Sequence, residues 1–367
     1  MVARVGQGSS GGGASEVRIE SLPVMRDTNF GSVCLDVSID DFNRSGFSYG
    51  DSLTISFSNG FGLGNIPYYN GYYAGVGDPL LAGYPGSPFI KAALNYGDSL
   101  WQMAGLGEGD TATVALREAG AYRSVQETFD ISYTNNRDDY DTDQQFANFR
   151  ACAGGRMRPG HVFRSASPVD NEYNRVPYAS ALMRDAGVAF ILNLSDNPGE
   201  VDRYVAESTA QGIDMSYFHG LRDAGKVAML DLTASFPSDE FARSLAGGFA
   251  EMGRHEGPYL VHCIEGKDRT GFACVLLEAL CGATYDEMLA DYMETYANYY
   301  DFTRESDPDR FDAIAGLNLD GMLRFLADAD DWVDLRSIDY DGPVRAYLRR
   351  GGMSKGEIDA LVARLCD

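Results

Sequence analysis

The residues of this chain with the clearest chemical potential are Cys263 and Arg269, which five residues separate within the segment 262–271. A cysteine at the start of a helix and beside an arginine is stabilised as a thiolate, which is a strong nucleophile. The planar guanidinium of an arginine matches two oxygens of a phosphate group. Together the two residues predict nucleophilic attack on a phosphate ester.

A strand and a helix must position this pair. The apolar run from Tyr259 to His262 is β-prone and predicts a buried strand. From Thr270 onward a buried helix is predicted by apolar residues at helical spacing, namely Phe272, Val275, Leu276 and Ala279. Between the two elements, the backbone N–H groups of the loop and the positive end of the helix form a site for a phosphate dianion.

The arrangement of His262-Cys263 and Arg269-Thr270-Gly271 resembles the signature loop of the cysteine-dependent protein tyrosine and dual-specificity phosphatases. The Gly-Lys-Asp tripeptide between them resembles the bacterial, lipid-phosphatase-like branch of that family. The resemblance implies a reaction that needs no metal and no cofactor.

The resemblance also implies a role for each residue of the loop. Cys263 forms a cysteinyl-phosphate, and Arg269 stabilises the charge on the equatorial oxygens. Thr270 hydrogen-bonds the sulfur and eases its departure, while His262 organises the loop. The remaining phosphate-binding residues are Ile264, Glu265, Gly266 and Lys267.

The general acid has three candidates. Classical tyrosine phosphatases carry it on a Trp-Pro-Asp loop about thirty to forty residues before the signature. Neither tryptophan of this chain lies in that window, although Asp223 and Asp231 do. Asp268 matches the loop aspartate of the bacterial branch, so we favour Asp268 and keep the other two as alternatives.

Two charged loop residues bear on the substrate. Lys267 is a second cation beside the phosphate, which suits a second phosphate, as on phosphoinositides, as well as a phosphopeptide. Glu265 replaces the usual small residue and would repel phosphate if it pointed inward. We therefore expect Glu265 to face outward and to pair with a basic group. The tripeptide Asn193-Leu194-Ser195 stands where the family usually has Asp-Leu-Arg, so that arginine is missing.

The chain divides into regions of different character. Residues 1–15 are a flexible Gly/Ser tract. Residues 16–134 predict a small all-β domain, either a barrel or a sandwich. Its strands are expected at 17–22, 33–39, 53–57 and 111–116, and its Tyr-rich segment at 65–73 is expected to pack a loop-rich core.

The polar stretch 135–145 predicts a linker, and the phosphatase resemblance covers about residues 145–367. Helices alternate with strands in that part, which predicts an α/β domain with a mostly parallel sheet flanked by helices. The signature loop then lies at the carboxyl edge of the sheet. Within this domain, residues 202–212 predict a helix and residues 215–219 a short strand.

Composition and charge limit the classes of function. Hydrophobic residues make up 44% of the chain, as in a globular protein, and the net charge of −24 disfavours a nucleic-acid partner. Six scattered cysteines show no metal-ligand spacing and imply no disulfide framework. No run approaches the ~20 apolar residues that span a bilayer.

The sequence thus predicts a phosphomonoester hydrolase, with protein-tyrosine phosphatase activity expected first. A phosphoinositide or inositol polyphosphate phosphatase is the alternative with the same chemistry. A phosphate-binding module with a degenerate site is the alternative from a different class. The compartment stays open, either cytoplasmic or, if the Gly/Ser tract follows a removed signal, secreted or on the cell surface. The oligomeric state stays open as well.

Overall fold

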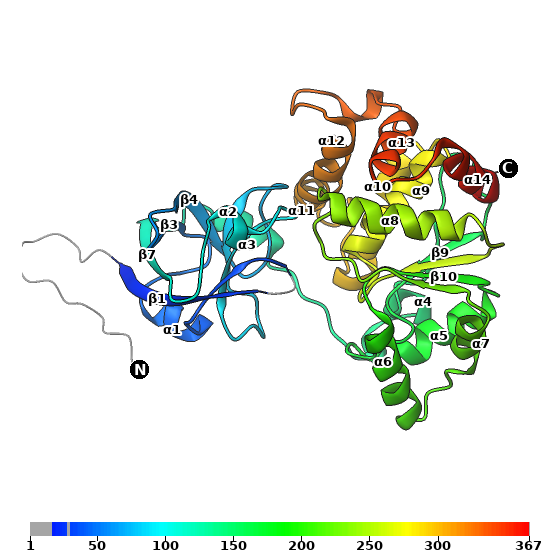
Figure 1. The fold of residues 1–367 in the computed structure, drawn as a ribbon, viewed down its shortest axis with the longest axis horizontal. Coiled ribbons are helices and arrows are strands. Elements are labelled where there is room, and N and C mark those ends of the chain that lie inside the picture. Colours follow the sequence, from blue (N-terminus) through cyan, green and yellow to red (C-terminus); the bar gives the residue numbers. More distant parts are fainter. Residues whose placement is uncertain (1–16, 28–29, 367) are drawn as a thin grey trace, which may run out of the picture. The chain divides into compact units, whose positions relative to one another are not determined.

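The structure is a computed structural model that describes residues 17–27 and 30–366. The chain forms two compact units, of which the first ends at Ile131 and the second begins at Ser132 (Figure 1). The Gly/Ser tract expected over residues 1–15 lies outside the described residues.

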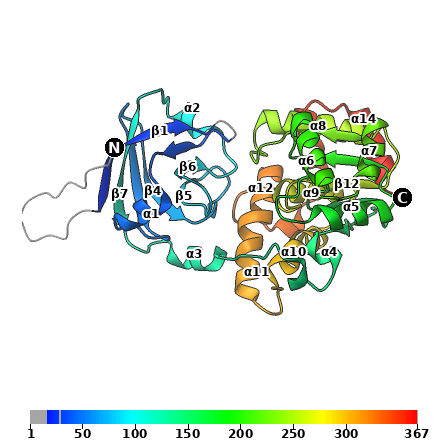
Figure 2. The ribbon, with the colours of Figure 1, turned by 90° about the horizontal axis from the view of Figure 1, so that it is seen from below.

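The first unit is a closed β-barrel (Figure 2), which decides between the two predicted all-β architectures. Its described strands are β1 (Arg18–Arg26), β2 (Val33–Leu35), β3 (Ser52–Phe57), β4 (Gly62–Tyr69), β5 (Pro79–Ala82), β6 (Ile90–Leu94) and β7 (Thr111–Glu118). They follow the order β1-β2-β6-β5-β4-β3-β7, and only β4 and β5 pair in parallel. Three short helices accompany them, α1 (Ile39–Arg44), α2 (Leu100–Met103) and α3 (Arg123–Phe129).

The barrel core is built from alternate strand positions. On β3, the side chains of Leu53, Ile55 and Phe57 are buried, as a strand with one face toward a core requires. Tyr68 and Tyr69 at the end of β4 are also buried. Tyr68 packs in the barrel core and Tyr69 in a second buried cluster, as expected, whereas Tyr72 of the same segment is 38% exposed.

The second unit is built on a five-stranded sheet with the order β11-β10-β12-β9-β8. Its strands are β8 (Arg150–Ala151), β9 (Val162–Ser165), β10 (Phe190–Asn193), β11 (Val227–Met229) and β12 (Tyr259–His262). Four of them are parallel, and only the edge strand β8 is antiparallel to its neighbour. The predicted mostly parallel sheet is confirmed.

Helices cover both faces of this sheet (Figure 1). The helices described in this unit are α4 (Asp143–Phe146), α5 (Val176–Asp185), α6 (Pro198–Ala210), α7 (Ser216–Asp223), α8 (Asp239–Met252), α9 (Asp268–Leu280), α10 (Tyr285–Tyr300), α11 (Pro308–Ala315), α12 (Gly321–Ala327), α13 (Asp341–Arg350) and α14 (Lys355–Leu365), with short helical turns at Arg137–Asp139, Gly316–Asp320 and Leu335–Ser337. Buried side chains of α5, α6 and α7 pack with Ile191 and Leu260 on one face. Helices α8 and α9 lie against the strands on the other face. None of the described helices is both long enough and apolar enough to cross a bilayer.

Two predicted strands are wrong in extent or type. The strand expected over 33–39 stops at Leu35, because the Ser38 side chain accepts a hydrogen bond from the N–H of Asp41 and begins α1. The segment expected as a strand at 215–219 enters α7 instead. Its buried residues, Phe218 and Leu221, are three apart, which is a helical spacing.

The polar stretch expected to be a linker belongs to the second unit. It forms a short helical turn and then α4, whose N-cap is Thr142. The rings of Tyr140 and Phe146 are buried together with that of Tyr299 on α10. The polar and turn-forming residues of this stretch therefore form turns within the folded unit and do not form a flexible linker.

A disulfide bond joins Cys281, directly after α9, to Cys366 near the end of the chain. The scattered cysteines implied no disulfide framework, and this bond corrects that expectation. The two cysteines are 85 residues apart in the sequence. Their spacing carries no signal, because packing of the last helices brings them together.

Candidate active site

The loop between β12 and α9 lies at the carboxyl edge of the sheet. Its strand, β12, is central, with β10 on one side and β9 on the other. It ends at His262, as predicted, and α9 begins at Asp268, two residues before the predicted start. The predicted order of strand, loop and helix is confirmed, and it places Cys263 at the base of the loop and Arg269 in the first helical turn.

Gly266 allows the tight turn of this loop. Its φ angle is +70°, in the left-handed region that side chains rarely adopt. A Cβ atom at this position would also clash with the backbone of Ser165 and Ala166. The loop therefore needs glycine here on two separate grounds.

Each carbonyl group of the loop has a hydrogen-bond partner, and three of the five partners come from other parts of the chain. The carbonyl oxygen of Ile264 accepts a hydrogen bond from the N–H of Ser167 at 2.9 Å, and that of Glu265 accepts one from the Tyr299 hydroxyl at 2.7 Å. The carbonyl oxygen of Gly266 accepts from Arg164 Nη2 at 2.8 Å. The carbonyl oxygen of Lys267 accepts from the N–H of Gly271 at 2.7 Å, and that of Cys263 lies 3.2 Å from His262 Nδ1. In a trans peptide unit the N–H points opposite to the preceding carbonyl. The N–H groups of residues 264–268 therefore turn inward, and they donate to no other group in the described part of the chain.

A buried charge network behind the loop supports this geometry. The Arg164 side chain, 1% exposed, forms an ion pair with Asp291 on α10 while it holds the loop carbonyl. Arg150 donates to the other Asp291 oxygen at 3.0 Å and to Asn148 Oδ1 at 2.6 Å. Asn148 in turn donates to the carbonyl of Gly266 at 3.2 Å. These charges are paired and hydrogen-bonded, as buried charges must be.

This network was not predicted from the sequence. Its members lie on β8, β9 and α10 and just before β8, far from the signature loop in the chain. One signal was present. Arg164 occurs inside a strand between Phe163 and Ser165, and a buried strand does not keep an arginine without an anionic partner.

Arg269 is held by a backbone contact only. Its Nη1 donates to the carbonyl of Leu232 at 2.8 Å, and no carboxylate of the described residues lies within ion-pair distance of it. The N–H of Leu232 in turn bonds the carbonyl of Leu194, next to the end of β10. In the same tripeptide, the Asn193 side chain caps the turn by accepting from the N–H of Ser195 at 3.0 Å. Asn193, which stands where the family usually has an aspartate, thus stabilises this turn.

The remaining predicted residues surround the nucleophile. Cys263 is 4% exposed and has a free thiol. The Thr270 hydroxyl is buried and has no partner among the described residues, which leaves it available to the sulfur. Burial lowers the pKa of His262 to about 4, so its ring is neutral and can organise the loop but carries no charge at pH 7.

The three acid candidates lie in different places. Asp268 begins α9, and the surrounding protein hinders hydration of its carboxylate and raises its pKa, although 38% of the side chain stays exposed. Asp231 is exposed and directly precedes Leu232, which contacts Arg269. Asp223 ends α7, on the amino side of β11 and therefore at the opposite edge of the sheet from the loop.

Glu265 is only partly exposed, at 24% of its side chain. It pairs with Lys267 at 3.8 Å, which fits the expected basic partner. Its second partner was not predicted from the sequence: the hydroxyl of Tyr133 donates to the carboxylate. Tyr133 lies 132 residues earlier in the chain, inside the range 16–134 that was expected to form the β domain, whereas it belongs to the second unit.

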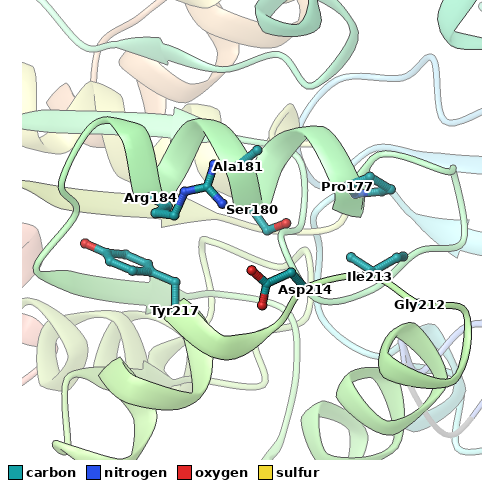
Figure 3. A pocket seen from close by; sticks show the side chains of 8 residues that line it. All are labelled: Pro177, Ser180, Ala181, Arg184, Gly212, Ile213, Asp214 and Tyr217. Carbon is teal, nitrogen blue, oxygen red and sulfur yellow. The ribbon is translucent and has the colours of Figure 1, made fainter.

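Two other places in this unit could hold a ligand. Cys152, Glu278 and Asp291 bring possible metal-ligating atoms within 4.8 Å of one another, but the charge of Asp291 is already shared by two arginines. A cavity of about 250 Å³ lies between α5 and the segment 212–217 (Figure 3). It contains none of the predicted catalytic residues.

The comparison with a family model agrees with the fold of the second unit. A model of the family described as "Tyrosine phosphatase family" matches residues 144–367. A Cupriavidus necator protein with the name "Putative tyrosine-protein phosphatase" is 28% identical over 196 residues, which cover 50% of this chain and 70% of that protein. A solved structure of an uncharacterized conserved protein from Thermotoga maritima shows 19% identity and a TM-score of 0.23 over 27% of this chain and 36% of its own, so this similarity says nothing about the fold.

Proposed function

Because the chain belongs to the tyrosine phosphatase family, we propose that it hydrolyses phosphotyrosine in proteins through a cysteinyl-phosphate intermediate. The observation that supports the proposal is that all five carbonyl groups from Cys263 to Lys267 have hydrogen-bond partners, three of which come from other parts of the chain. The N–H groups of residues 264–268 are left without an acceptor among the described residues, so they can hold a phosphate dianion by hydrogen bonds that need no side chain.

In the first step, the Cys263 thiolate attacks phosphorus and forms an S–P bond. The bond between phosphorus and the tyrosyl oxygen breaks, and the leaving oxygen takes a proton from Asp268. Arg269 and the loop N–H groups bind the equatorial oxygens, whose charge they stabilise in the transition state. Asp268 suits the role of proton donor because its raised pKa keeps it protonated at higher pH than an ordinary aspartic acid.

In the second step, water attacks the phosphorus of the cysteinyl-phosphate. The S–P bond breaks, the thiolate returns to Cys263, and the Asp268 carboxylate accepts the proton that the water loses. A hydrogen bond from the buried Thr270 hydroxyl would stabilise the departing sulfur. The products are inorganic phosphate and the free enzyme.

Cys263→Ser tests the proposal, because a serine hydroxyl is not ionised at pH 7 and cannot attack. We expect loss of turnover on a phosphotyrosine peptide with retained peptide binding. Wild-type activity should resist chelators and be lost to thiol alkylation. Cys34→Ser, which makes the same chemical change in the barrel, is the matched control. Turnover by Cys263→Ser at the wild-type rate would exclude the mechanism.

A phosphoinositide is the second candidate substrate, since Lys267 is another cation of the signature loop, two residues before Arg269. Assays on phosphotyrosine peptide, phosphoserine peptide and phosphoinositides would rank the three substrate classes. Binding without turnover on any of them would indicate a phosphate-binding module.

A further inference from the structure

Lys267 is the cation that could recognise a second phosphate, but it is already surrounded by its own partners. Its Nζ lies 3.8 Å from the carboxylate of Glu265 and 3.9 Å from that of Asp268. It also donates to the Tyr300 hydroxyl at 3.3 Å. Only 19% of the Lys267 side chain is exposed, so these partners, and not water, neutralise its charge.

Glu265 is held firmly in the position where it compensates Lys267. Tyr133 donates to its carboxylate, and Tyr299 donates to its backbone carbonyl at 2.7 Å. The rings of these two tyrosines stack with centroids 4.9 Å apart. The guanidinium of Arg175 lies 5.0 Å from the centre of one ring and 4.8 Å from that of the other. Contacts to both side chain and backbone thus fix the carboxylate.

Arg175 also fixes the segment that carries Tyr133. Its side chain is 2% exposed and donates to Asn135 Oδ1 at 2.8 Å and to the carbonyl of Phe146 at 2.9 Å. Tyr133 therefore contacts Arg175 and Tyr299 through its ring and Glu265 through its hydroxyl. The Glu265 carboxylate cannot move away from Lys267 without losing its hydrogen bond to this segment.

Lys267 and Arg269 therefore differ in what they can offer a substrate. Arg269 has no carboxylate partner among the described residues and can give its charge to the phosphate that undergoes reaction. A second phosphate near Lys267 would have to displace Glu265 and would meet a carboxylate of like charge. The charges around Lys267 and Arg269 therefore suit a substrate with one phosphate group and disfavour a substrate with two.

We propose that Glu265, held by Tyr133, is a specificity-determining residue that restricts the site to esters with a single phosphate. This inference rests on the proposed phosphatase function, and it favours phosphotyrosine over polyphosphorylated inositols and their lipids. Tyr133 acts as a positioning residue, because it touches Glu265 and acts on the substrate only through it.

The test compares kcat/KM for a phosphotyrosine peptide with kcat/KM for a soluble inositol bisphosphate that carries its phosphates on adjacent carbons. Glu265→Gln keeps the shape of the side chain and an acceptor for Tyr133 but removes the negative charge. We expect the ratio of bisphosphate to monophosphate kcat/KM to rise about tenfold, because Lys267 loses one of its two carboxylate partners and Glu265 no longer repels the second phosphate. Adding Lys267→Met to Glu265→Gln should remove the gain.

Glu294→Gln is the matched control, since it changes the net charge equally at an exposed position on α10. Tyr133→Phe should shift the ratio in the same direction as Glu265→Gln but by less. An unchanged ratio in Glu265→Gln, or an equal rise in Glu294→Gln, would overturn the role of Glu265.

In the Cys263→Ser protein, the binding affinities for the inositol bisphosphate and the phosphotyrosine peptide are also measured, and their ratio needs no turnover. Failure of the wild-type protein to hydrolyse either substrate would overturn the proposed function. In that case the binding ratio, with and without Glu265→Gln, still decides the role of Glu265: a tenfold shift supports it, and equal ratios contradict it.

Discussion

Asp268 is the residue on which the two halves of the proposed reaction depend, since it would give a proton in the first and take one in the second. Hindered hydration raises its pKa, and the nearby Lys267 acts in the opposite direction. The protonated form therefore survives to a higher pH than in an ordinary aspartic acid. As the pH rises through this raised pKa, the acid is lost and the rate of the first step should fall.

Asp268→Asn should slow phosphotyrosine hydrolysis by about 10²–10⁴-fold, the usual contribution of a general acid. An aryl phosphate with an activated leaving group should lose much less, because its phenolate leaves without a proton. The fall in rate on the basic side of the pH profile should flatten in the mutant. Steady-state kinetics on both substrates across the pH range measures all three effects.

Asp231→Asn and Asp223→Asn are the controls for this assignment. Asp231 lies near Arg269, whereas Asp223 lies at the far edge of the sheet, so Asp223→Asn should be silent. If Asp231→Asn shows the leaving-group dependence and Asp268→Asn slows both substrates equally, then Asp231 is the acid and Asp268 only shapes the loop.

At the scale of elements, the site depends on a segment that precedes the recognised family region. The family match begins at residue 144, but Tyr133, Asn135 and Tyr140 already pack on the second unit. Arg137 extends this packing through its ion pair with Asp143 at 2.6 Å. The folded second unit therefore begins at Ser132, before the first residue of the family match.

Two truncated chains test this boundary. A chain that starts at Ser132 should fold and hydrolyse a small aryl phosphate at the wild-type rate. A chain that starts at Thr142 should be less stable by about 3 kcal/mol or more, the usual cost of removing a buried aromatic side chain. Thermal or urea unfolding of the two proteins measures the difference. Equal stability and equal activity would show that residues 132–141 are dispensable.

The sequence predicted the elements whose signals are local. The strand before Cys263 and the helix after it carry apolar residues at the periods of a strand and a helix. The barrel strand β3 likewise alternates between buried and exposed positions. The segment 215–219 failed because five residues are too few to distinguish the two periods.

The residues that contact the loop from other elements could not be predicted from these local signals. Arg164, Asp291 and Tyr299 reach the loop from β9 and α10, and Tyr133 reaches it from the start of the unit. Their contacts depend on how the sheet and helices pack. No period or spacing in the sequence encodes that packing, so long-range partners could be found only from the structure.

At the scale of the whole molecule, the disulfide between Cys281 and Cys366 ties the end of the chain to the helix that follows the loop. Of the six cysteines, Cys34, Cys152, Cys263 and Cys274 are free. Such a crosslink limits the freedom of the unfolded chain. Stability of the second unit should therefore depend on the redox state of the protein.

Thiol titration in denaturant tests this pairing, with four reactive thiols expected before reduction and six after it. Cys366→Ser should lower the free energy of unfolding by about 2–5 kcal/mol under non-reducing conditions. Under reducing conditions the mutant and the wild type should have similar stability. Six reactive thiols in the unreduced protein would show that the bond does not form.

The most direct test of the proposed reaction is detection of the phosphoryl group on Cys263. Wild-type protein is mixed with a phosphotyrosine peptide, quenched in acid within one turnover and digested, and the fragments are weighed by mass spectrometry. We predict one phosphoryl group on the fragment that contains Cys263, and none on that fragment from Cys263→Ser. Rapid turnover with no phosphoryl group on this fragment would contradict the covalent mechanism.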